Sequence, residues 1–171
     1  MKFSTVLLIA ALGTASAVAS AGDDKITAEE FAKKAGAAGA AEVEMGKLGV
    51  EKATNADVKA YAQKIVADHT KANKELMAAA KGKNLQVPAE PDMMHKGMME
   101  KFEHQSADHD FNEDYMEQMI RDHKKAIEVF QSAANDNTLD PEMRALAKKT
   151  LPTLEQHLAD AQKLEAKLDK Q

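Results

Sequence analysis

The sequence contains no cysteine and no tryptophan, and aromatic residues make up only 4% of its 171 positions. Without cysteine the chain forms no disulfide, offers no thiolate nucleophile and holds no cysteine-ligated zinc. It also contains no Gly-x-Ser-x-Gly element and no glycine-rich phosphate loop, so neither a hydrolase elbow nor a nucleotide site is indicated. We therefore expect a protein that is not an enzyme, in which any site is built from histidine, carboxylate or thioether groups.

Long apolar runs are also missing, apart from a short one at the N-terminus. Lys2 precedes the apolar segment 3–12, and small residues lead from there to Ala21. This order is typical of a cleaved signal peptide, and the run is too short to span a bilayer. We expect residues 1–21 to be a signal peptide and residues 22–171 to be one domain without a transmembrane anchor. Export without disulfides fits the bacterial periplasm.

The chain also has no excess of positive charge. The net charge is −5, and removal of the predicted signal peptide, with one lysine and no acid, makes it −6. Nucleic-acid binding depends on neutralised phosphates, so we expect no nucleic-acid partner. An envelope protein is a possible partner, and the sequence leaves the oligomeric state open.

Helix-forming residues dominate what remains, and no segment alternates as a strand does. Helix starts are marked by a capping box at Thr27 and Glu30, a cap at Asn55 or Thr54, an Asp110 cap and the pair Asp140-Pro141. The fold class is therefore all-α, with four long helices that we expect to form an up-down bundle. The predicted helices are 27–53, 55–82, 110–137 and 141–171, with a short helix at 92–104 inside the connector 83–108.

Apolar residues recur at helical spacing along each long helix, and each such seam includes one ionisable residue near its middle. A four-helix bundle buries these seams in its core, and the rise of ~1.5 Å per residue places the four polar residues at similar depth. Two similar blocks, Asp68-His69 and Asp122-His123, add a carboxylate beside the seam. The predicted mid-bundle layer consists of Glu42, Asp68, His69, Asp122, His123 and His157.

A buried layer of imidazoles and carboxylates has three interpretations. One is a metal site for Zn, Fe, Mn or Cu, in which an Asp orients a histidine ligand of a neighbouring helix. The second is a structural hydrogen-bond network in an envelope stress or interaction protein. The third is a proton-coupled or catalytic role. No histidine follows a glutamate by three positions, so the Glu-x-x-His pattern of di-iron bundles is missing.

The connector holds a second group of candidate ligands, rich in methionine. Thioether and imidazole together suit Cu(I), whereas paired methionines also fill gaps on the inner face of a short helix. The residues concerned are Met93, Met94, His95, Met98 and Met99, followed by His104 and His109.

Several of these runs together resemble the DUF4142 family. They are Glu42-Val-Glu-Met-Gly-Lys-Leu48, Val58 to Leu76 with its Asp68-His69 pair, Phe111 to Phe130 with Asp122-His123, and Leu151-Pro-Thr-Leu-Glu-Gln-His157. The resemblance extends over about residues 26–168. It implies an exported bacterial protein with a ferritin-like bundle and a long crossover between the second and third long helices, and it implies no reaction.

Overall fold

The computed structural model describes residues 25–169, so the predicted signal peptide lies outside the described residues. Regular structure in this part of the chain is entirely helical, which confirms the all-α prediction. No helix in the described range is long and apolar enough to cross a membrane. The helices are α1 (Ala28–Lys52), α2 (Ala56–Ala80), α3 (Met93–His104), α4 (His109–Asn135) and α5 (Pro141–Leu168).

Side-chain caps fix where the helices begin. Thr27 and Glu30 form the expected capping box of α1: the Glu30 amide donates to Thr27 Oγ1 at 3.1 Å, and the Thr27 amide donates to Glu30 Oε2 at 3.0 Å. Asp140 caps α5, also as expected, and of the two candidates Thr54 and Asn55 it is Asn55 that caps α2. The predicted cap of α4 is wrong: Asp108, not Asp110, accepts the Phe111 amide at 3.0 Å. Asp110 instead lies in the first turn of that helix.

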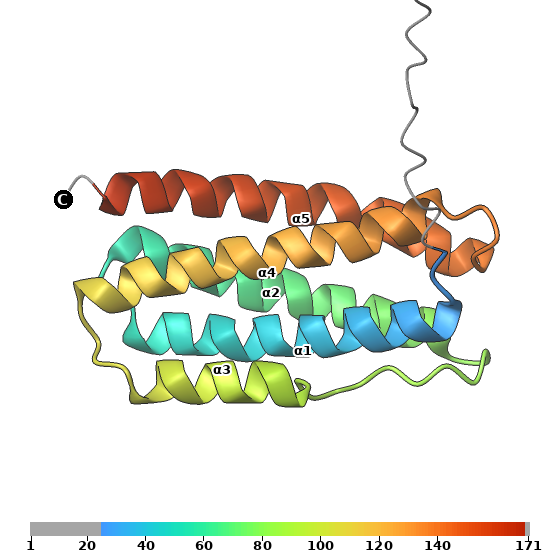
Figure 1. The fold of residues 1–171 in the computed structure, drawn as a ribbon, viewed down its shortest axis with the longest axis horizontal. Coiled ribbons are helices and arrows are strands. Elements are labelled where there is room, and N and C mark those ends of the chain that lie inside the picture. The colour runs from blue at the N-terminus through green and yellow to red at the C-terminus, as the bar shows by residue number, and fades with distance from the viewer. Residues whose placement is uncertain (1–24, 170–171) are drawn as a thin grey trace, which may run out of the picture.

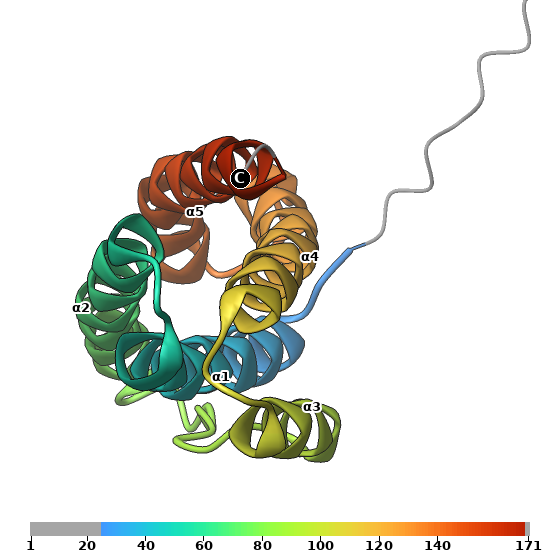
Figure 2. The same cartoon turned by 90° about the vertical axis from the view of Figure 1, so that its left-hand side faces the viewer.

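The four long helices surround a common core (Figures 1 and 2). Viewed along the helices, α1, α2, α5 and α4 follow one another around a ring, and α3 lies outside it beside α1. The chain runs in one direction in α2 and α4 and in the opposite direction in α1 and α5. Each helix of the ring is therefore antiparallel to both of its neighbours, and α2 lies diagonally across from α4.

The connector that contains α3 makes this order possible. It leaves α2 at one end of the molecule and returns along α1 to the other end, where α4 begins (Figure 1). Gly82, at φ +86°, begins the connector in the left-handed region that glycine tolerates best. The structure thus has the long crossover that the family resemblance implies.

The core consists of two hydrophobic clusters on either side of a polar layer. The first cluster surrounds Tyr61, Phe111 and Tyr115. The second surrounds Phe31 and Met143. The ionisable seam residues lie between the two clusters along every long helix, and all four are buried. They are Glu42, His69, His123 and His157.

Small residues let α1 lie close to its neighbours. A Cβ added to Gly49 would lie 2.6 Å from Cζ of Tyr115 and 2.8 Å from Cβ of Ala62. Such distances are too short for van der Waals contact, so a side chain at position 49 would push α1 away from α4 and α2. Close packing here brings the seam of α1 near the centre of the ring.

Asn112 joins the loop between α1 and α2 to the start of α4. Its Oδ1 accepts the amides of Thr54 and Asn55 at 3.1 and 3.3 Å. Its Nδ2 donates to Thr54 Oγ1 at 2.8 Å and to the Asp108 carbonyl at 3.0 Å. The side chain is buried, so these four bonds replace those that water would make.

We predict that Asn112→Ala lowers the free energy of unfolding by about 2 kcal/mol, because it leaves several polar groups without partners and opens a small cavity. Urea unfolding measures the change. Gln131→Ala, on an exposed position of the same helix, is the control and should shift stability by no more than about 0.5 kcal/mol. Equal effects of the two substitutions would contradict the role of Asn112.

Candidate metal centre

Three histidine side chains meet in the middle of the ring. His69 comes from α2, His123 from α4 and His157 from α5, and one nitrogen from each ring lies within 4.8 Å of the other two. The ring centroids are 5.3 to 5.5 Å apart. His123 and His157 are 0% exposed and His69 is 6% exposed. We call these three residues the histidine layer.

A main-chain carbonyl fixes the orientation of His123. Its Nδ1 lies 2.8 Å from the carbonyl oxygen of Met119, one turn earlier on the same helix. A carbonyl oxygen only accepts hydrogen bonds, so Nδ1 carries the proton and donates. In the neutral ring, Nε2 of His123 is consequently left with a bare lone pair.

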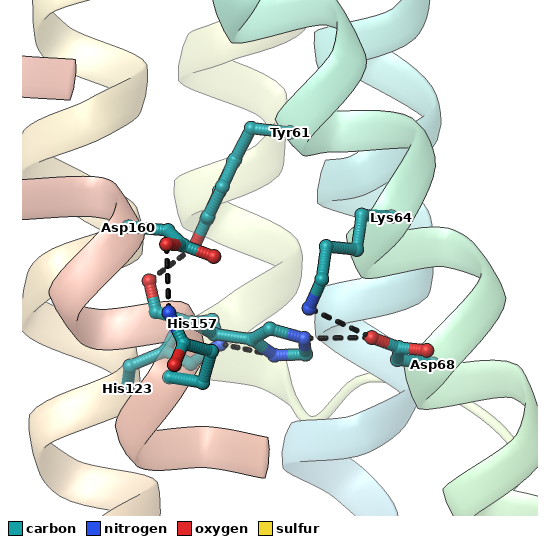
Figure 3. Close-up of polar contacts among 7 residues, drawn as sticks. Tyr61, Lys64, Asp68, His123, His157 and Asp160 are labelled. Carbon is teal, nitrogen blue, oxygen red and sulfur yellow. Dashed lines mark hydrogen bonds and ion pairs between the residues drawn. The ribbon is translucent and has the colours of Figure 1, made fainter.

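A carboxylate from the neighbouring helix fixes His157 (Figure 3). Nε2 of His157 lies 2.9 Å from Oδ2 of Asp68, which also accepts from Lys64 Nζ at 3.0 Å. Partial burial works against ionisation of Asp68, but the bonds from His157 and Lys64 outweigh it and lower the pKa of the carboxyl. Nε2 of His157 therefore donates, and its Nδ1 carries the lone pair. Tyr61 adds a second link to this helix, because its hydroxyl donates to the His157 carbonyl at 3.3 Å.

The inner nitrogens of His123 and His157 face each other with no proton between them. Nε2 of His123 and Nδ1 of His157 lie 3.3 Å apart (Figure 3). Each neutral ring has one proton, and both protons are donated outward, to Met119 and to Asp68. Two lone pairs do not form a hydrogen bond, so this contact requires a shared proton or another cation.

A third imidazole nitrogen in this layer also lacks a hydrogen-bond partner. Nε2 of His69 is buried and has no hydrogen-bond partner in the described part of the chain. Buried polar atoms without partners are rare and costly. The histidine layer thus brings together three imidazoles whose nitrogens are not all satisfied by protein groups.

The surroundings oppose a proton as the missing cation. Burial lowers the pKa of His123 to about 4, although the Met119 carbonyl works in the other direction. Burial, followed by the nearby His123 and His157, lowers the pKa of His69 well below its ordinary value. Burial also lowers the pKa of His157, against the effect of Asp68. The rings are therefore neutral at neutral pH, which is the form that binds metal ions.

Glu42 lies beside the histidine layer, in surroundings that disfavour its ionisation. Its Oε1 is 3.6 Å from Nδ1 of His123, and its Oε2 is buried without a partner in the described residues. Burial raises the pKa of Glu42 well above its ordinary value, and the negative charge of Asp122 adds to the effect. A cavity of about 30 Å³, enough for a water molecule, is lined by Glu42 and His69 together with mostly apolar groups.

The structure separates the two Asp-His blocks that look alike in the sequence. Asp68 reaches His157 across the helix boundary, which is the pairing that the metal interpretation expects of such an Asp. Asp122 instead accepts from Gln118 Nε2 at 2.7 Å on its own helix. Of the six predicted residues, the structure brings together the three histidines, with Asp68 and Glu42 against them, and leaves Asp122 outside the group.

Two contributors were not predicted from the sequence. Lys64 precedes Asp68 by four residues, a spacing that places both on one helix face and that could have revealed the pair. The Met119 carbonyl leaves no trace in the residue type, because every residue carries one. Its role follows only from the orientation of the His123 ring.

Comparison with known proteins identifies the family to which the chain is similar. A family model described as "Domain of unknown function (DUF4142)" matches residues 13–164, which is most of the chain. The resemblance predicted from the sequence runs is therefore confirmed. Searches of the curated proteins and of the solved structures found no match.

We predict that the metal-free protein loses stability on acidification. The folded-state pKa of His123, about 4, lies below the ordinary 6.5, so between these values the unfolded chain binds more protons. The stability from neutral His123 is complete above pH 6.5 and is lost as the pH falls toward 4, by up to ~1.4 kcal/mol per pH unit. Chemical unfolding in chelator from pH 7 to pH 4.5 measures the slope.

Two variants identify the groups responsible for this slope. His123→Gln should reduce the slope of unfolding free energy against pH by the amount that corresponds to about one bound proton. Glu42 acts in the opposite sense, because its raised pKa adds stability that declines as the pH rises above 4.5, so Glu42→Gln should steepen the slope. A slope unchanged in both variants would contradict the assignment.

Proposed function

The chain belongs to the DUF4142 family, and we propose that it binds a transition-metal ion through the three imidazoles of the histidine layer. The observation that carries the proposal is the pair of facing, unprotonated nitrogens on His123 and His157. A metal ion accepts both lone pairs and the unpartnered nitrogen of His69 as well. A purely structural network would leave these atoms repelling one another or unsatisfied.

The spacing of the nitrogens fits an ion between them. Imidazole binds zinc at about 2.0–2.1 Å, and two ligands of a tetrahedral ion at this distance are about 3.3–3.4 Å apart. Nε2 of His123 and Nδ1 of His157 are 3.3 Å apart. The outward partners of the two rings, a carboxylate and a main-chain carbonyl, are those that commonly orient histidine ligands.

The donor set favours some ions over others. Three neutral imidazoles suit Zn, Cu and Fe, whereas Mn prefers oxygen ligands. The nearest carboxylates do not supply them: Asp68 is bonded to the outer nitrogen of His157, and Glu42 favours its protonated form. We therefore place Zn, Cu and Fe ahead of Mn.

We propose binding and not catalysis as the role of this site. The hollow beside the histidine layer, about 30 Å³, holds little more than a water molecule. The N-terminal pattern that resembles a signal peptide supports a periplasmic location, where metal ions from outside the cell arrive first.

We also propose that the fold is a ferritin-like four-helix bundle. Support comes from the antiparallel ring of α1, α2, α5 and α4 and from the long crossover between α2 and α4 (Figures 1 and 2). The site proposed here differs from a di-iron centre, since it consists of imidazoles and lacks the Glu-x-x-His pattern.

We predict that Zn²⁺ or Cu²⁺ stabilises the protein, by about 2.7 kcal/mol at a free-ion concentration 100 times Kd. Differential scanning calorimetry of the chelator-treated protein, with Zn, Cu, Fe and Mn added separately, measures the rise in Tm. His69→Ala should abolish the rise, and His104→Ala, at an exposed position of α3, should retain it. If none of the four ions stabilises the wild-type protein, the layer is structural and the proposal fails.

We predict that the two Asp-His blocks respond differently to mutation. Asp68→Ala should weaken metal binding 10- to 100-fold, the usual loss when the partner of a histidine ligand is removed. Asp122→Ala should have little effect, because the Asp122 carboxylate accepts from Gln118 and forms no hydrogen bond or ion pair with the three histidines among the described residues. Competition with a chromophoric chelator measures both affinities. Equal losses in the two variants would show that charge, and not contact with His157, matters.

A further inference from the structure

A second hollow lies beneath α3, and none of the three histidines of the layer lines it. It has a volume of about 190 Å³ and is bounded by α1, α3 and α4. Its lining combines thioether, imidazole and carboxylate groups with apolar side chains and the side chains of Lys34 and Lys125. We call it the α3 pocket; the lining residues that matter here are Glu42, Met45, Met94, His95 and Asp122.

The position of α3 on α1 brings His95 level with Met45. Lys52 Nζ donates to the carbonyls of Phe102 and Glu103 at 2.8 and 2.6 Å, which ties the last turn of α3 to the last turn of α1. The two helices run in the same direction (Figure 1). Met45 precedes Lys52 by seven residues, and His95 precedes Phe102 by the same number. Because both helices rise equally per residue, Met45 and His95 lie at the same level.

His95 presents one unprotonated nitrogen and is held in place through the other. Its Nδ1 lies 2.7 Å from Oδ1 of Asp92, and its amide donates to the same oxygen at 2.9 Å. A carboxylate accepts, so Nδ1 is the donor and Nε2 carries the lone pair. The side chain is only 13% exposed, and Nε2 has no hydrogen bond among the described residues. As with Asp68 and His157, a carboxylate holds one ring nitrogen, but here it holds Nδ1 and leaves Nε2 with the lone pair.

The methionines of α3 divide into two kinds. Met98 and Met99 pack against the hydrophobic core, as gap-filling residues do. Met94 does not fill a gap, because it is 61% exposed, and it lines the α3 pocket. Met45 is 1% exposed and lines the same pocket. Two thioethers from different helices thus accompany the imidazole of His95.

We propose that the α3 pocket is a copper(I) site, in which Nε2 of His95 and the thioether sulfurs of Met45 and Met94 hold the ion. Soft thioether ligands select Cu(I) over Zn²⁺ and over harder cations. The buried carboxyl of Glu42, whose Oε2 has no partner in the described residues, lies in the same pocket and adds negative charge when it ionises. This site uses none of the three histidines of the layer, so it stands or falls independently of the function proposed above.

Anaerobic titration of the metal-free protein with Cu(I), in competition with bicinchoninate, tests the site. The wild-type protein should hold one Cu(I) that Met94→Ala and His95→Ala each weaken by at least about tenfold. Met45→Leu, which keeps the volume and removes the sulfur, should do the same.

Matched controls lie on the same helix. Met93→Ala removes a neighbouring methionine that is 84% exposed and does not line the pocket, and His104→Ala removes an exposed histidine. Both should bind Cu(I) as the wild type does. Equal weakening by Met93→Ala and Met94→Ala would mean unspecific binding to exposed thioethers and would overturn the proposal.

His69→Ala separates this site from the histidine layer. The variant should still bind Cu(I) with wild-type affinity, and its X-ray absorption spectrum should show sulfur as well as nitrogen neighbours. Loss of Cu(I) in His69→Ala, with no loss in His95→Ala, would place the ion in the histidine layer and refute the α3 pocket as its site. Circular dichroism of each variant confirms that weakened binding is not caused by unfolding.

Discussion

The contact between the inner nitrogens of His123 and His157 is the constraint around which the core is arranged. Each ring donates its single proton outward, to the Met119 carbonyl and to Asp68, and the two lone pairs are left 3.3 Å apart. Burial makes an extra proton costly, as the lowered pKa values of the imidazoles indicate. The hydrogen bonds to Met119 and Asp68 therefore determine that the two inner nitrogens face each other without protons. This is the observation on which the proposed metal site rests.

The remainder of the fold holds this polar layer at fixed depth between two apolar clusters. Each of the four long helices contributes one buried member of this layer near its middle, and the rings lie between the two clusters. Gly49 permits the close approach of α1 to Tyr115, and Asn112 fastens the loop before α2 to the start of α4. The apolar packing thus holds the helices in place around the imidazoles of the layer.

Much of this could be predicted from the sequence, because caps and seams are local patterns. Thr27, Asn55 and Asp140 gave the helix starts, and helical spacing brought the three histidines to one depth. The cap of α4 was misplaced because Asp108 and Asp110 are two residues apart and either can accept an amide. Local patterns could not predict that Asp68 contacts His157 whereas Asp122 accepts a hydrogen bond from its own helix. These contacts depend on which helices are neighbours in the ring. The α3 pocket likewise requires the contact of Lys52 with α3.

The mid-helix position of the layer has a consequence for how the length of this chain can vary. One residue inserted between Asn55 and His69 would rotate the imidazole by about 100° around α2 and remove it from the layer. The same holds between Asp108 and His123 and between Asp140 and His157. The connector before α3 is under no such restriction, because lengthening a loop costs little free energy. Insertions and deletions among related sequences should therefore gather at residues 81–92 and avoid the segments that lead from each cap to its histidine.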